Sequence, residues 1–204
     1  MTTLTIDNFK AMIENALANI TARSDEFSQL DAVIGDGDHG TAIVTAFTAV
    51  RDGGVNGTEF KQMLNDMAFG VMLQTSGSTS TLIGGLFLGM SDSVSGTELD
   101  AAAVKAMFAG GLAGVQKQTK AVPGDKTMMD ALVPAVNAIQ ACESDDIKAI
   151  ITAGAEAALA GAKETVAMKA NFGRARNYGE KSIGYADSGA TSWACMIESF
   201  ANAL

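Results

Sequence analysis

Apolar residues recur at intervals of three and four along almost the whole of this 204-residue chain, and only two prolines interrupt the pattern. Side chains at this spacing lie on one face of an α-helix, so the pattern predicts helices that each bury one side. The clearest stripe runs from Phe60 to Met72. Alanine and methionine, both good helix formers, are abundant. The predicted fold class is therefore all-α.

Segments rich in glycine, proline or hydroxyl residues divide this pattern into eight expected helices. Thr97 and Asp100 are spaced as a capping box that opens the fifth helix, and Pro134 is expected to kink the sixth without ending it. In order, the helices are expected at residues 6–20, 40–51, 60–75, around 82–90, from 97 to before 122, from within 124–135 to about 142, from 144, and from 189.

Eight helices with mostly short connections pack antiparallel, each beside its neighbours. In such an up-and-down barrel or bundle, alternate loops lie at the same end. The distinctive segments are loops one, three, five and seven of this order, at residues 30–41, 75–81, 122–127 and 171–188. Their convergence predicts one functional site at one end of a single domain that spans residues 1–204, a length that suits one domain.

The first of these segments, LDAVIGDGDHGT, is the most unusual part of the chain. Asp31, Asp36 and Asp38 bring three negative charges together without a lysine or arginine between them. Two carboxylates about 5 Å apart repel by roughly 3 kcal/mol at an effective dielectric near 20, so a cation is expected there. Sparse oxygen ligands suit Mg²⁺, which completes its shell with water and phosphate. The helix expected to begin near His39 or Gly40 would present free N–H groups to an anion.

Simpler interpretations of this segment stay open. Its glycines satisfy GxGxxG, but aspartates stand where a bare pyrophosphate would lie. An EF-hand beginning at Asp36 needs a glutamate at its twelfth position, where this chain has Phe47. The segment could also be a solvated acidic turn without a metal. His39 by itself is more typical of a structural hydrogen bond than of a catalyst.

The other segments each have a functional and a structural interpretation. The hydroxyls of residues 75–81 suit phosphate oxygens, or an ordinary helix N-cap. Met128 could cover a base or fill the core. Arg174 suits a phosphate because its guanidinium forms a fixed fork of donors. Asp187 and Gly189 could form only a turn and an N-cap.

Composition excludes several classes of function. The net charge of −9 argues against nucleic acid or an anionic membrane as a partner, since both are bound by basic surfaces. No apolar run is long enough to span a bilayer, and the N-terminus lacks the pattern of a signal peptide. Cys142 and Cys195 are expected to be buried free thiols, as in cytoplasmic proteins. A cytoplasmic location is therefore expected.

Four motifs together carry a family resemblance. In chain order they are IGDGDHG, PGDKTM, GRA followed by GEKSIG, and DSGATS. In this order and across nearly the whole chain, they resemble the nucleotide-binding L subunit of dihydroxyacetone kinase. The resemblance implies an eight-helix antiparallel barrel that holds ADP or ATP at one end through two Mg²⁺ ions.

The resemblance also implies roles for individual residues. Asp31, Asp36 and Asp38 would be the metal ligands and, with Arg174, the catalytic residues. Residues implied to contact the nucleotide are His39, Gly40, Thr41, Ser78, Thr79, Thr119, Met128, Arg174, Asp187 and Gly189.

A free-standing chain of this length is similar to the phosphotransferase-system form of the family. Such a subunit is recharged by a phosphohistidine M subunit and passes phosphate to dihydroxyacetone on a separate K subunit. The chain departs from the family pattern at Ala42, at Thr45 and Ala46, in SGSTS at residues 76–80, and at Thr119 and Ser188. Every carboxylate is kept, so metal binding is expected, whereas the departures fall at positions expected to face the nucleotide.

Three functions therefore stay open. The first is a phosphoryl-transfer subunit acting on dihydroxyacetone, or an ATP-dependent one acting on another small hydroxyketone. The second is a nucleotide-loaded regulatory or adaptor protein without transfer. The third is a purely structural helical bundle that binds no nucleotide.

Overall fold

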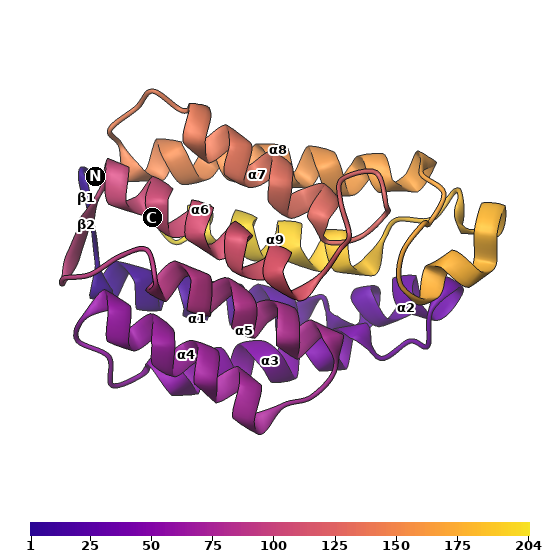
Figure 1. Ribbon diagram of the computed structural model, residues 1–204, viewed down its shortest axis with the longest axis horizontal. Coiled ribbons are helices and arrows are strands. Elements are labelled where there is room, and N and C mark those ends of the chain that lie inside the picture. The colour runs from indigo at the N-terminus through magenta and orange to yellow at the C-terminus, as the bar shows by residue number, and fades with distance from the viewer.

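The computed structural model describes all residues, 1–204, and the chain folds almost entirely into helices (Figure 1). The all-α class is confirmed. The helices are α1 (Ile6–Ala22), α2 (Ser24–Ile34), α3 (His39–Gly54), α4 (Phe60–Gln74), α5 (Ser78–Ser91), α6 (Ala101–Gln118), α7 (Met129–Ala141), α8 (Ile147–Glu164) and α9 (Ser188–Asn202), with 3-10 helices η1 (Thr165–Ala167) and η2 (Arg174–Ser182).

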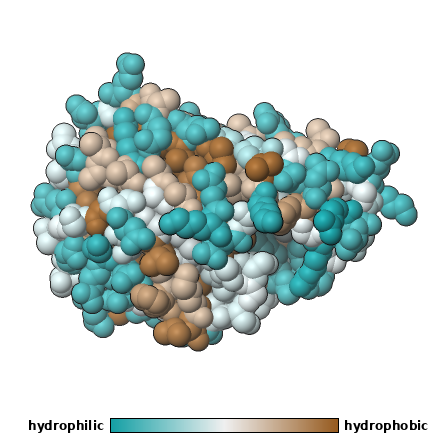
Figure 2. All heavy atoms as spheres, in the orientation of Figure 1, coloured by the Kyte–Doolittle hydropathy of each residue, from teal (hydrophilic) through white to brown (hydrophobic).

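The long helices run side by side along the long axis, and successive ones alternate in direction (Figure 1). Both termini lie at one end, beside a small antiparallel sheet of β1 (Thr3–Thr5) and β2 (Glu98–Asp100). The other end carries α2 and η2. That end is largely hydrophilic on the face seen in Figure 2, in keeping with the polar sequence RARNYGEKS of η2.

One continuous core of 51 buried residues joins the helices. Helix α9 lies among α1, α7 and α8, and its buried residues include Trp193 and Phe200. Aromatic rings connect the layers, since Phe9 meets Phe60 edge to face at 5.8 Å between ring centroids and also lies beside Phe200. Burying large side chains of this kind stabilises the fold by about 1.5–3 kcal/mol each. None of the helices combines the length and the apolar character that a bilayer crossing requires.

The structure corrects the expected elements at two places. Residues 24–34 were assigned to no helix in the sequence, yet they form α2, so the chain has nine α-helices rather than eight. The predicted capping box is also wrong. Glu98–Asp100 forms β2, and Asp100 is itself the N-cap of α6, accepting a hydrogen bond from the N–H of Ala103 at 2.8 Å.

Smaller differences concern where helices begin. Helix α5 begins at Ser78, so half of the hydroxyl-rich segment belongs to its first turn. Helix α8 begins at Ile147 instead of Ser144. Pro134 lies inside α7, which continues through it to Ala141. The irregular stretch before α9 contains η2.

Candidate functional site

A cavity of about 920 Å³ opens at the end of the molecule that carries α2 and η2. All four of the distinctive segments line it, through residues such as Asp36, Ser78, Lys126 and Arg174. The convergence predicted from the order of the loops is therefore present. A volume of this size suits a ligand as large as a nucleotide.

The acidic wall of the cavity is built by the end of α2 and the turn into α3. One carboxylate oxygen from each of Asp31, Asp36 and Asp38 can be chosen so that all three lie within 4.8 Å of one another. Asp31 is held in place because its Oδ2 accepts a hydrogen bond from the N–H of Gly37 at 2.7 Å. Arg174, reaching over from η2, forms an ion pair with Asp36. The cluster thus has one nearby cation of its own and room for hard metal ions.

Two helix N-termini without side-chain caps line the same cavity, and that of α3 directly follows Asp38. Helix α3 begins at His39, and α5 begins at Ser78 after Gly77, and neither has a side-chain hydrogen bond at its N-cap. Gly77 has a φ of 98°, a left-handed conformation that glycine adopts without strain. Unpaired N–H groups and the positive end of the helix dipole favour anions at such positions. The two helix N-termini therefore offer positions near the carboxylates where an anion would be stabilised.

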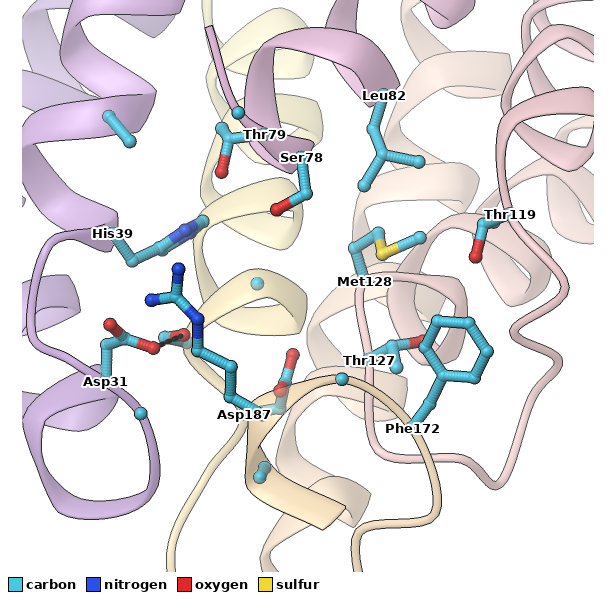
Figure 3. Close-up of a pocket in the computed structure, with 18 of the residues that line it drawn as sticks. Asp31, His39, Ser78, Thr79, Leu82, Thr119, Thr127, Met128, Phe172 and Asp187 are labelled. Carbon is cyan, nitrogen blue, oxygen red and sulfur yellow. Dashed lines mark hydrogen bonds between the residues drawn. The ribbon is translucent and has the colours of Figure 1, made fainter. Parts of the chain in front are cut away.

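The opposite wall of the cavity is more apolar (Figure 3). Leu82 from α5, Met128 from the start of α7 and the ring of Phe172 from the segment before η2 lie around it, and Thr119 and Thr127 add hydroxyl groups to the same wall. A flat apolar ligand group fits such a wall, with the hydroxyls available for its polar edge. The cavity thus has a charged half and an apolar half.

Asp187 connects these two halves at the N-terminus of α9. Its Oδ2 accepts a hydrogen bond from the N–H of Ala190 at 2.6 Å, as an N-cap does. Burial raises the pKa of Asp187 to about 7, and the negative charges of Asp130 and Asp31 act in the same direction. Gly189 lies close by, since a Cβ at this position would approach the backbone nitrogen of Met128 at 3.5 Å.

His39 has a structural contact as well as a place in the cavity. Its Nε2 lies 2.7 Å from the hydroxyl of Ser192 on α9. Burial lowers the pKa of His39, whereas the charges of Asp31 and Asp38 act in the opposite direction. This imidazole is therefore held between α3 and α9 rather than free in the cavity.

Most of the predicted site residues line the cavity, but two do not. Gly40 and Thr41 lie outside the lining, although their backbones belong to the first turn of α3. Gly40 packs against α2, where a Cβ would overlap the carbonyl oxygen of Ser24. The predicted residues in the lining are Asp31, Asp36, Asp38, His39, Ser78, Thr79, Thr119, Met128, Arg174, Asp187 and Gly189.

Sequence reasoning missed two residues that line the cavity, Phe172 and Lys126, and one residue that holds the adjoining loop, Asp130. Phe172 gives the apolar wall its aromatic ring. Asp130 is buried and accepts hydrogen bonds from the N–H groups of Gly124 and Thr127, which shapes the loop before α7. Lys126 is buried, and its ammonium group contacts four main-chain carbonyls. A charged residue between a proline-glycine turn and an apolar helix was the available signal for Lys126, whereas Asp130 lies in the first turn of α7 itself.

Comparison with known proteins assigns the chain to a family. A family model described as the DAK2 domain matches residues 33–202. The chain belongs to the DAK2 domain family. The resemblance drawn from the four motifs is thereby confirmed.

Two relatives of this DAK2 domain chain differ in length. The ADP-binding subunit DhaL of PEP-dependent dihydroxyacetone kinase 1 from Listeria innocua is 33% identical over 173 residues, which cover 83% of this chain and 82% of the relative. L-erythrulose 1-kinase from Mycolicibacterium smegmatis is 35% identical over 208 residues, which cover 97% of this chain but only 35% of the relative. The DAK2 domain therefore occurs both as a subunit and as part of longer kinases.

A solved structure shares the fold of this DAK2 domain chain. It is the crystal structure of the dihydroxyacetone kinase from C. freundii in complex with AMP-PNP and Mg²⁺, with a TM-score of 0.71 and 21% sequence identity. The match covers 96% of this chain and 33% of the C. freundii chain.

Proposed function

We propose that this chain is the nucleotide-binding subunit of a dihydroxyacetone kinase and works in the cytoplasm. It would carry ADP or ATP with two Mg²⁺ ions, receive phosphate from a phosphohistidine M subunit, and pass it to dihydroxyacetone on a separate K subunit. The observation that carries the proposal is the three-carboxylate cluster that lines one cavity together with two helix N-termini that have no side-chain cap. The Listeria innocua relative, which is named an ADP-binding subunit, supports the same function.

The donor set fits magnesium. Asp31, Asp36 and Asp38 offer only carboxylate oxygens, the hard ligands that Mg²⁺ prefers, and two of the three residues are exposed. Such a cluster leaves part of the metal shell for phosphate oxygens and water. When bound, Mg²⁺ would neutralise charge on the phosphates and on the group being transferred.

The residues of the chain itself account for binding and orientation of the nucleotide. The N–H groups at the starts of α3 and α5 would hold phosphate oxygens, and Arg174 would add a fixed positive charge beside Asp36. The apolar wall with Met128 and Phe172 would receive the base. Phosphoryl transfer depends mainly on such positioning and electrostatics.

The cavity does not supply a free general base for an acceptor hydroxyl. Its one imidazole, His39, is bonded to Ser192, and the buried carboxyl of Asp187 caps α9. This arrangement agrees with an acceptor that is held and activated on another protein. The kinase would then be complete only when that partner docks at the cavity.

The test is nucleotide binding in variants of the acidic cluster. Native mass spectrometry and calorimetry with Mg-ADP should show binding by the unsubstituted protein and at least a tenfold loss in Asp36→Asn and Asp38→Asn. Helical content by circular dichroism should stay the same, because both side chains are exposed. Asp66→Asn, on the exposed face of α4, is the control for the charge change. Equal affinity in all four proteins would refute the metal assignment.

A second acceptor has support of its own. The relative with 35% identity is named L-erythrulose 1-kinase, so another small hydroxyketone is a candidate substrate. Reconstitution with K- and M-type partner proteins, comparing phosphate transfer to dihydroxyacetone and to erythrulose, separates the two acceptors. Tight nucleotide binding without phosphate transfer to either acceptor would instead favour a regulatory or adaptor role. The hydroxyl side chains of Ser78 and Thr79 at the start of α5 are compatible with that role.

A further inference from the structure

The most unusual group near the cavity is the ammonium of Lys126, which contacts only main-chain carbonyl oxygens. Its Nζ lies 2.9 Å from the oxygen of Thr165, 3.1 Å from that of Met168, 2.7 Å from that of Ser182 and 2.6 Å from that of Tyr185. An ammonium group has three protons, so at least one is shared between two carbonyls. No donor is left for a ligand in the cavity, and a direct phosphate contact by Lys126 is therefore excluded.

These four carbonyls belong to the two arms of one segment, residues 165–187. Thr165 and Met168 lie on the arm that leaves α8, and Ser182 and Tyr185 lie on the arm that returns to α9. The arms also bond to each other, since the N–H of Gly184 donates to the oxygen of Val166 at 2.8 Å. Lys126 thus joins both arms at the base of the segment.

The segment of residues 165–187 carries residues that line the cavity, among them Arg174 and Asp187. Arg174, between the two arms, pairs with Asp36, and Asp187 ends the returning arm at the start of α9. The side chain of Arg174 is 65% exposed, so little packing holds it in place. Its position therefore depends on how the whole segment is anchored.

Burying the ammonium group of Lys126 is energetically unfavourable. Lysine is almost never fully buried unless it is paired, because its charge loses hydration. Burial lowers the pKa of Lys126, and the negative charge of Asp187 only partly offsets this effect. The backbone of Lys126 also has a φ of 62°, a left-handed conformation that is unfavourable for a residue with a side chain. A side chain that merely filled this space would not need a buried charge.

We propose that Lys126 is a positioning residue, whose ammonium group ties the two arms of residues 165–187 together and so holds Arg174 and Asp187 at the nucleotide cavity. This inference rests on the proposed function for its consequence, since nucleotide is the ligand that these residues would contact. It assigns Lys126 no contact with the nucleotide, only with the segment that closes one side of the cavity.

The first test is a double-mutant cycle on Mg-ADP affinity. Lys126→Met keeps the length of the side chain and removes its charge, and it should weaken binding about tenfold. In an Arg174→Ala background the same change should weaken Mg-ADP binding less than about threefold, because there is no longer an arginine that a shift of the segment could displace. Equal losses in both backgrounds, or no loss in either, would overturn the proposal.

Lys105→Met is the matched control. The Lys105 ammonium also donates to a main-chain carbonyl, that of Cys142, but at the end of the molecule away from the cavity. This variant should bind Mg-ADP as the unsubstituted protein does. A loss equal to that of Lys126→Met would show that removing any contact between a lysine and a main-chain carbonyl weakens binding, and would refute a positioning role.

The second test does not need nucleotide. Amide hydrogen exchange in the ligand-free protein should become at least tenfold faster in residues 169–186 of Lys126→Met, with exchange in α5 unchanged. If the unsubstituted protein binds no Mg-ADP, the proposed function fails, and the exchange comparison still tests whether Lys126 holds the segment. Unchanged exchange would refute that role whatever the nucleotide result.

A second variant covers the case in which Lys126→Met does not fold. Lys126→Gly relieves the left-handed backbone and leaves space where the ammonium group lies. Ammonium chloride should then slow exchange in residues 169–186 and strengthen Mg-ADP binding at least threefold, whereas tetramethylammonium chloride at the same concentration should do neither. Equal effects of the two salts would overturn the proposal.

Discussion

Asp130 offers the most direct test of how the loop before α7 is held. It is 3% exposed, and its two carboxylate oxygens accept hydrogen bonds from the N–H groups of Gly124, at 2.5 Å, and Thr127, at 2.8 Å. A hydrogen bond to a charged group contributes about 1.5–3 kcal/mol. Water can reach the exposed Gly124 after the change, but Thr127 would lose its partner beneath the loop. Asp130→Ala should therefore lower the free energy of unfolding by about 3 kcal/mol.

Urea unfolding followed by circular dichroism measures this loss. The midpoint should fall while the m-value stays constant, because the folded core is unchanged. For a chain of this size the melting temperature should fall by roughly 6–12 °C. Asp125→Ala is the matched control. Its carboxylate accepts one hydrogen bond, from the N–H of Val122 at 2.9 Å, and is only half-buried, so about 1 kcal/mol or less is expected. Equal losses in the two variants would refute the assignment of Asp130 as the organiser of this loop.

Two further predictions concern the thiols and one turn. Burial raises the pKa of the Cys195 thiol and shields it from reagents. At pH 8 a thiol reagent should therefore modify the half-buried Cys142 first, and Cys195 only on unfolding. Equal rates of modification of the two thiols in the folded protein would contradict this. Gly77→Ala should cost about 1–2 kcal/mol of unfolding free energy from its φ of 98° alone, since a Cβ there meets no atom within 4 Å. An unchanged urea midpoint would show that the turn before α5 relaxes instead.

Local patterns in the sequence were enough to predict the long helices and the common end of the four loops. Each long helix has a continuous apolar face, such as the stripe from Phe60 to Val71 in α4, and this face is what the core buries. Short connections then force neighbouring helices to alternate in direction. The position of the cavity follows from these two facts without any knowledge of side-chain contacts.

Elements that are held by contacts with residues far away in the sequence were not predicted, because no local pattern indicates them. Helix α2 buries only Phe27 and Ile34 and has no side-chain cap, so its apolar signal is weak, and it is held by packing against α3. Strand β2 forms because Leu99 pairs with Leu4, far away in the sequence. A threonine three residues before an aspartate looks the same whether a helix or such a strand follows.

Lys126 shows this limit at the cavity itself. Its partners are carbonyl oxygens 39 to 59 residues away, and a main-chain carbonyl is present at every position whatever its side chain. A sequence motif can indicate side chains that would meet a ligand, as proposed for Asp36 and Arg174, because their chemistry is specific. It cannot reveal which carbonyls a lysine will meet. The residues that touch a ligand can therefore be proposed from sequence, whereas the residues that hold them in place need coordinates.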